Sequence, residues 1–129
     1  MKIIISPAKK LCSQPMNKEV RASKIQFETE AKYLIAQLRK YPVAQVKQMM
    51  NLSDSLAKLN FDRFKSWDLK SEYVNHAIYM FKGDVYKGLK VNDLTDDEIL
   101  FAQDNLLIIS GLYGILKPLD LIYPYRLEM

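Results

Sequence analysis

Hydrophobic residues fall into two short strand-length runs and several longer stretches with helical spacing. The strongest run is residues 106–109, four consecutive aliphatic side chains that Ser110 and Gly111 interrupt. This pattern predicts a buried strand, and the Gly-containing turn after such a strand is a common place for binding groups in α/β proteins. A second strand is predicted over residues 2–5, and its uniformly apolar character places it inside the sheet.

Three stretches carry the spacing of amphipathic helices. Residues 23–41 are predicted as the first, with Ser23 as N-cap and an apolar stripe formed by Phe27, Ala31, Leu34, Ile35 and Leu38. Residues 71–81 are predicted as a second helix, which carries the single histidine, His76. A third begins near residue 96, capped by Asn92 or Thr95, and its acidic first turn complements the helix dipole.

Residues 43–59 contain two short apolar stripes that a tight turn separates. This arrangement is a candidate helix-hairpin-helix element, in which backbone N–H groups and a helix N-terminus face a phosphate oxygen. Asn51, Leu52 and Ser53 would form the hairpin, Ser53 or Asp54 would cap the second helix, and Lys47, Lys58, Arg63 and Lys65 would flank the phosphates. The usual hairpin has two glycines, which this segment lacks, so a plain αα-hairpin in the core remains the alternative.

Composition restricts the class of protein. A chain of 129 residues with 49% hydrophobic and 26% charged residues is the size and type of one ordinary globular domain. No apolar run approaches the ~18 residues of a membrane span, and the short apolar run at the N-terminus does not resemble a signal peptide. A single cysteine, Cys12, cannot form an internal disulfide. We therefore expect a cytoplasmic protein without a membrane partner.

Charge is divided unevenly between the two halves of the chain. Residues 1–70 hold 14 Lys or Arg against 6 Asp or Glu, whereas residues 71–129 hold 5 against 9. A basic half indicates a surface that meets polyanions, and a solvated lysine-rich surface is the alternative.

Three polar segments follow predicted elements and would form one cleft if the fold brings them together. They are SPAK after the first strand, KGDVY after residue 81, and SGLYG after the second strand. The candidate cleft residues are Ser6, Lys9, Lys82, Asp84, Tyr86, Ser110, Tyr113 and Arg126. Such a cleft predicts an enzyme that acts on a small anionic or nucleotide-like substrate. The alternative is that these segments are ordinary turns, and no residue is assigned a catalytic role.

Metal and cofactor chemistry find little support in the sequence. His76 has no Cys or His partner at metal-ligand spacing, and the acidic run 96–98 matches the first turn of a helix. No Gly-rich phosphate loop of the GxxxxGK[ST] type is present. We therefore predict no metal site and no cofactor.

Four long motifs together resemble the YaaA-like bacterial peroxide stress response family. They are ISPAK, which ends at Lys9, then FKGDVYKGL (81–89), SGLYGILKPLD (110–120) and PYRLEM (124–129). Members of that family are about twice as long, so the resemblance implies that residues 1–129 are the amino-terminal part of a larger single domain. The absence of a polar tail at residues 126–129 agrees with this expectation.

The resemblance carries further expectations. It implies an α/β fold with a mixed sheet, flanking helices and an embedded helix-hairpin-helix-like element at residues 43–59. It also implies a cytoplasmic protein of the oxidative stress response that binds double-stranded DNA without strong sequence preference and limits damage from unincorporated iron. Relatives carry basic residues near the positions of Asn51 and Ser55, and this chain does not, so its hairpin is expected to bind DNA more weakly. Neither the oligomeric state nor any catalytic residue follows from the resemblance.

Overall fold

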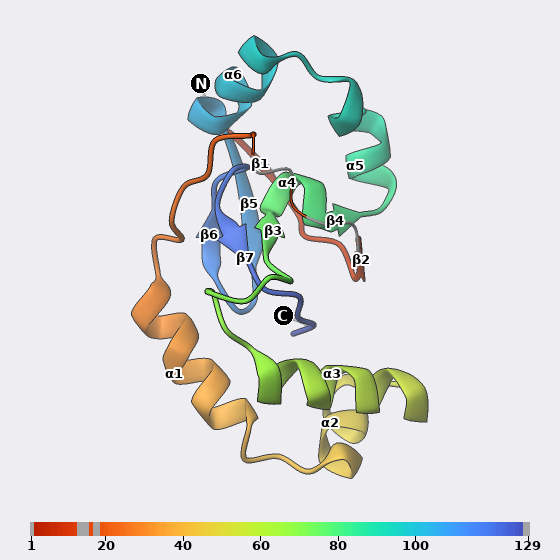
Figure 1. The fold of residues 1–129 in the computed structure, drawn as a ribbon. Helices are drawn as coiled ribbons and strands as arrows, with labels where there is room; N and C mark the ends of the chain where they lie inside the picture. The colour runs from red at the N-terminus through yellow and green to blue at the C-terminus, as the bar shows by residue number, and fades with distance from the viewer. Residues whose placement is uncertain (1, 13–15, 17–18, 128–129) are drawn as a thin grey trace.

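The computed structural model describes residues 2–12, 16 and 19–127, which form a mixed α/β structure with several small sheets (Figure 1). The strands are β1 (Ile3–Ile5), β2 (Lys10–Leu11), β3 (Asn75–His76), β4 (Phe81–Lys82), β5 (Leu106–Ser110), β6 (Gly114–Leu116) and β7 (Leu121–Ile122). The helices are α1 (Glu28–Leu38), α2 (Val43–Met50), α3 (Asp54–Ser66), α4 (Ala77–Met80), α5 (Asp84–Leu89) and α6 (Asp96–Asn105), with a 3-10 turn η1 (Val91–Asp93). In the view of Figure 1, α1, α2 and α3 lie below the sheets, α6 lies above them and α5 lies to their right.

The strand predicted at residues 106–109 is confirmed as β5, the middle strand of a three-stranded sheet. It pairs in parallel with β1 and antiparallel with β6. The prediction that the first strand lies inside the sheet is wrong. In the described part of the chain β1 is an edge strand that pairs with β5 alone, and Ile4 is 63% exposed.

Residues 71–81 do not form the predicted helix. Asn75 and His76 pair as β3 with Ile122 and Leu121 of β7, and only the four residues of α4 are helical. Phe81 then pairs as β4 with Leu11 of β2. The helical spacing of apolar residues is present, but strand partners distant in the sequence provide the backbone hydrogen bonds instead.

The first helix begins later than its sequence predicts. Ser23 is not the N-cap of α1, since its hydroxyl donates to Oδ1 of Asp120 at 2.5 Å and its backbone forms an isolated bridge to that residue. The helix starts at Glu28, after Phe27. A serine is equally suited to cap a helix or to satisfy a buried carboxylate, and here the carboxylate is its partner.

The caps predicted for two other helices are confirmed. Ser53 accepts a hydrogen bond from the N–H of Leu56 at the start of α3. Thr95 forms a capping box with Glu98 at the start of α6, in which each side chain accepts from the other residue's backbone N–H. These contacts are local, so the sequence alone was sufficient to predict them.

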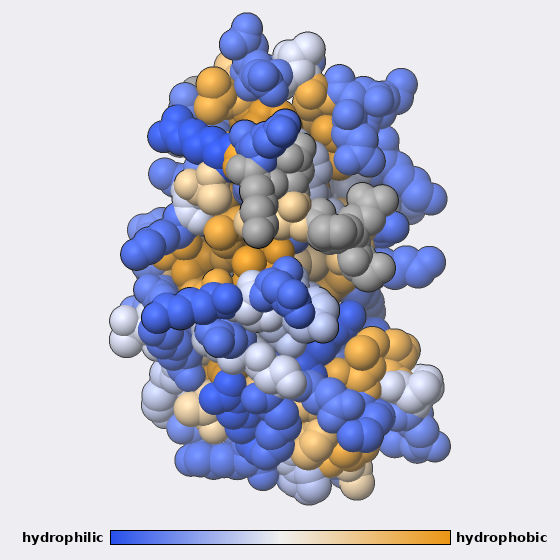
Figure 2. Space-filling model, viewed as in Figure 1, coloured by the Kyte–Doolittle hydropathy of each residue, from blue (hydrophilic) through white to orange (hydrophobic). Residues whose placement is uncertain are grey.

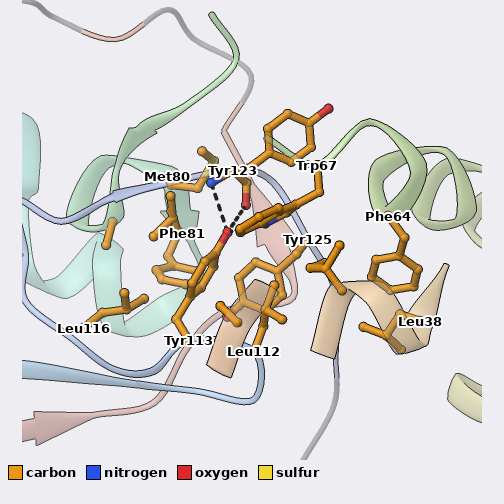
Figure 3. Packing of buried hydrophobic residues seen from close by; sticks show 14 of the residues in the cluster. Leu38, Phe64, Trp67, Met80, Phe81, Leu112, Tyr113, Leu116, Tyr123 and Tyr125 are labelled. Atoms are coloured by element: carbon orange, nitrogen blue, oxygen red, sulfur yellow. Dashed lines mark hydrogen bonds between the residues drawn. The ribbon is translucent and has the colours of Figure 1, made fainter. Parts of the chain in front are cut away.

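The core contains a cluster of aromatic side chains between β5, β7 and α3 (Figure 3). Tyr113 is fully buried at its centre and its ring packs edge-on against Tyr125, with ring centroids 5.1 Å apart. The Tyr113 hydroxyl accepts from Trp67 Nε1 and from the N–H of Tyr123, and it donates to the carbonyl of Tyr123. This cluster joins the C-terminal end of α3 to residues 121–125.

Candidate functional site

Two of the three segments predicted to form a cleft lie side by side. The hydroxyl of Tyr86 in α5 donates to the carbonyl of Ser6 at 2.8 Å. Lys10 and Lys82 are partners in the pairing of β2 with β4, and a Cβ added to Gly83 would lie 3.4 Å from Cβ of Ala8. The chain that follows β1 is therefore adjacent to the start of α5.

In the third segment, after β5, the side chains of Ser110 and Tyr113 are buried in the core. The buried hydroxyl of Ser110 accepts from the N–H groups of Leu112 and Tyr113 and forms a 2.6 Å hydrogen bond with the Tyr125 hydroxyl. Tyr125 in turn packs against Phe81, with ring centroids 6.3 Å apart. Ser110 and Tyr113 thus stabilise the turn and the core. The turn begins next to the chain that follows β1, because β1 and β5 are parallel neighbours with Ile5 opposite Ile108.

The buried phenols around the cleft stay neutral at pH 7. Burial raises the pKa of Tyr86 and that of Tyr113, and it raises the pKa of Tyr125 to about 12 although the bond from Ser110 opposes the shift. A neutral phenol donates a hydrogen bond but does not act as a base. Because the Tyr86 hydroxyl already donates to Ser6, its role in this structure is to hold the loop after β1 against α5.

The charged residues of the predicted cleft are mostly at the surface. Lys9, Lys82 and Asp84 are exposed, whereas Arg126 is half-buried. Lys82 and Tyr86 line a pocket of about 630 Å³ beside β4, α5 and η1. Sequence reasoning missed the other lining residues that matter most, which are Lys87, Lys90, Asn75 and Tyr79. Lys87 belongs to the motif FKGDVYKGL, which had already been singled out in the sequence. Asn75 and Tyr79 were not predicted as site residues, because residues 71–81 were wrongly predicted to form one helix.

Replacing Tyr86 by Phe is expected to lower the free energy of unfolding by about 1 kcal/mol, because the Ser6 carbonyl loses a partly buried hydrogen bond. Urea denaturation followed by circular dichroism measures the change. Tyr33→Phe is the matched control, since Tyr33 is 65% exposed and its replacement should have no measurable effect. Equal stability of the two variants would contradict a structural role for the Tyr86 hydroxyl.

The second candidate site is the hairpin that α2, residues 51–53 and α3 form. Asn51 has the left-handed backbone (φ 53°, ψ 55°) that a glycine usually provides at a helix end, and the N–H of Leu52 donates to the carbonyl of Lys47 at 3.0 Å. Ser53 caps α3, while the side chain of Leu52 is buried in the core. The chain therefore makes a tight turn without the glycines of the usual hairpin.

The basic residues assigned to this site are already engaged with other groups. Lys47 forms an ion pair with Asp54 at 2.7 Å, which lowers the pKa of that carboxyl, and Lys58 pairs with Asp62 at 2.9 Å. Met49, Leu56 and Leu59 are exposed between them, and Figure 2 shows hydrophobic surface over these two helices. The hairpin surface is thus mixed rather than purely basic.

Arg63 and Lys65 lie near the far end of α3, about 15 Å and about 18 Å from Ser53 at the rise of an α-helix. Arg63 is half-buried and donates to Asn60 Oδ1 at 3.3 Å, and burial lowers the pKa of its guanidinium. Lys65 donates to the carbonyl of Arg39 at 3.0 Å. Arg39 itself donates to the carbonyls of Phe64 and Trp67. The Arg39 contacts satisfy carbonyls at the C-terminal end of α3. Arg63 and Lys65 thus have structural partners at a distance from the hairpin.

Two further searches were negative within the described residues. No group of three or more His, Cys, Asp or Glu side chains in residues 2–12, 16 and 19–127 is arranged to hold a metal ion. None of the helices in this part of the chain has the length and apolar composition needed to cross a membrane.

The fold and its two candidate sites define an α/β protein with a two-helix hairpin and a lysine-lined pocket. Comparison with known proteins then gives the family. The family model described as peroxide stress protein YaaA matches residues 1–129, and the chain belongs to this family.

Similar curated proteins carry the name UPF0246. One from Legionella pneumophila (strain Philadelphia 1) is 44% identical over the whole chain and 51% of its own length. One from Clostridium beijerinckii is 44% identical over the whole chain, which covers 50% of that relative's length. One from Saccharophagus degradans is 45% identical over the whole chain, which covers 51% of its length. The chain thus spans about half the length of these relatives.

Proposed function

We propose that this peroxide stress family member acts in the cytoplasm by binding double-stranded DNA through the α2–α3 hairpin and that it helps limit damage from unincorporated iron. The observation that carries the DNA part is the hairpin itself. Its left-handed Asn51 and Ser53-capped helix start resemble the backbone arrangement that binds phosphate in helix-hairpin-helix elements. Such an element contacts phosphates and reads no base edge, so little sequence preference is expected.

Two exposed lysines are the groups that would add charge to this contact. They are Lys47, which forms an ion pair with Asp54, and Lys58, which forms an ion pair with Asp62. Exposed ion pairs contribute little to stability and exchange readily with other partners. A phosphate can therefore replace Asp54 and Asp62 as the partner of these lysines, at a lower net gain than for unpaired lysines.

The iron part of the proposal rests on the family's peroxide stress role. Ferrous iron converts peroxide into radicals that cleave nearby DNA. A protein that covers the phosphate backbone removes sites where iron can bind to it. Plasmid nicking by ferrous iron and peroxide should therefore decrease as the chain occupies the DNA, and unchanged nicking on saturated DNA would contradict this part.

Fluorescence anisotropy with two unrelated duplexes at two salt concentrations tests DNA binding. Lys47→Gln/Lys58→Gln is expected to weaken binding to both duplexes by about tenfold and to reduce the salt dependence by up to two phosphate contacts. Lys24→Gln/Lys40→Gln is the matched control, since these exposed lysines lie outside the hairpin. No binding at low salt, or equal loss in the two double variants, would overturn the proposal.

Asp54→Asn is expected to strengthen DNA binding in the same anisotropy experiment, the opposite of the effect of the lysine substitutions. The substitution removes the carboxylate that holds Lys47 and leaves the Ser53 cap in place. Binding should become several-fold tighter at low salt, and the gain should shrink as salt rises. Weaker binding by this variant would show that Asp54 itself contributes to the contact, contrary to the proposal.

A further inference from the structure

The pocket beside β4, α5 and η1 has the chemistry of a ligand site that is separate from the hairpin. Its volume of about 630 Å³ is within the range of sites for small molecules. A DNA duplex is too wide to enter a pocket of this size. Figure 1 also places α5 away from α2 and α3.

Three exposed lysines, Lys82, Lys87 and Lys90, line the pocket. Among its described lining residues one carboxylate, Asp93, opposes them. Several ammonium groups on the wall of one pocket attract anions, because the low-dielectric walls concentrate their field. The pocket therefore favours a ligand with more than one negative charge.

The backbone holds two of these lysines at a sharp turn. Lys90 ends α5 in the left-handed conformation (φ 52°), and its N–H donates to the carbonyl of Lys87 at 3.2 Å. A side chain other than Gly, Asn or Asp rarely takes this conformation, and a strained backbone often occurs at a ligand site. A lysine in this strained conformation at the wall of the pocket agrees with a role for its charge.

The opposite side of the pocket is aromatic and polar. Tyr79 is half-buried and its ring packs edge-on against His76, with ring centroids 5.7 Å apart. Phe81 and Tyr86 lie behind it with ring centroids 5.6 Å apart, and the buried amide of Asn75 also lines the pocket. A half-buried aromatic side chain in the pocket wall beside amide and ammonium groups suits a flat ring attached to an anionic group.

We propose that this pocket binds a nucleoside phosphate. Lys82, Lys87 and Lys90 would contact the phosphates, and Tyr79 would stack on the base. The phosphates would be held by side-chain ammonium groups, as expected for a chain without a Gly-rich phosphate loop. The proposal is independent of DNA binding, because it uses different residues on a different part of the fold.

Isothermal titration calorimetry of the purified chain with ADP, pyrophosphate and adenosine tests the proposal. ADP is expected to bind at least tenfold more tightly than pyrophosphate or adenosine, because only ADP contacts both the lysines and Tyr79. Absence of ADP binding up to millimolar concentration would overturn the proposal. Equal affinity for pyrophosphate would also overturn it, since the site would then be a simple anion site.

Single substitutions assign the binding to the pocket. Lys87→Gln and Lys90→Asn should each weaken ADP binding by about three- to tenfold, and Asn at position 90 tolerates the left-handed backbone. Tyr79→Leu should weaken ADP binding without changing that of pyrophosphate. Lys40→Gln, on a surface outside the pocket, is the control. If Lys40→Gln weakens ADP binding to the same extent as the pocket variants, the assignment to the pocket is overturned. Lys87→Gln and Lys90→Asn should both retain wild-type affinity for DNA, because they lie outside the hairpin.

Discussion

Replacing Tyr113 by Phe is expected to lower the free energy of unfolding by about 3–5 kcal/mol, a large part of the stability of an ordinary domain. The reason is that the Tyr113 hydroxyl uses its whole hydrogen-bonding capacity in a dry site. It accepts at 2.9 Å from Trp67 Nε1 and at 3.0 Å from the N–H of Tyr123, and it donates at 2.9 Å to the Tyr123 carbonyl (Figure 3). Removing one oxygen leaves three buried polar groups without this partner.

Tyr125→Phe provides the matched control for this experiment. Tyr125 is also buried, but its hydroxyl makes one hydrogen bond, to Ser110, whose oxygen still accepts from the N–H groups of Leu112 and Tyr113. Its replacement is expected to cost about 1 kcal/mol. Urea denaturation of both variants measures the difference. A loss for Tyr113→Phe no greater than that for Tyr125→Phe would show that water or a local shift replaces the missing contacts.

The importance of Tyr113 also shows where sequence reasoning succeeded and where it failed. The strand β5 and the turn at Ser110 were predicted, because apolar runs and Gly-containing turns are local signals. Tyr113 is bonded to Tyr123, 10 positions away in the sequence, and to Trp67, 46 positions away. No local sequence pattern predicts such contacts. For the same reason Ser110 and Tyr113 were predicted in a cleft, although the structure buries both in the core.

The errors in secondary structure have the same origin. The cap at Ser53 and the capping box at Thr95 depend on residues three positions away, and both predictions were correct. The helix over residues 71–81 failed because β7 competes for the backbone of Asn75 and His76. Of the pocket residues, the lysines of FKGDVYKGL were visible in the sequence, whereas the position of Tyr79 depended on this unpredicted strand pair.

The second large effect expected is a loss of stability in mild acid that depends on His76. Its ring is fully buried, and burial lowers its pKa, although the peptide groups of Val20 and Arg21 favour the charged ring. Neither ring nitrogen makes a hydrogen bond of good geometry within the described residues. The folded state therefore keeps the imidazole neutral at a pH where the unfolded chain already binds a proton.

The direction of the pH dependence follows from this difference. Below the unfolded pKa of about 6.5 the unfolded state binds more protons than the folded state, so stability falls as pH falls, by at most about 1.4 kcal/mol per pH unit. Between pH 7 and pH 5 the free energy of unfolding is therefore expected to fall, with an upper limit of about 2 kcal/mol for a ring that stays neutral over the whole interval. Asp120 acts in the opposite direction, because burial raises the pKa of its carboxyl and the folded state then takes up a proton first as pH falls.

The contribution of His76 can be separated from that of Asp120 by two variants. His76→Leu keeps a buried side chain of similar volume, and its free energy of unfolding should no longer fall between pH 7 and pH 5. Asp120→Asn removes the opposing carboxylate, and its stability should fall at least as steeply as that of the unmodified chain. Since His76 is the single histidine, a slope that persists in His76→Leu would have to come from carboxylates or the α-amino group. That result would contradict the assignment of acid sensitivity to this buried ring.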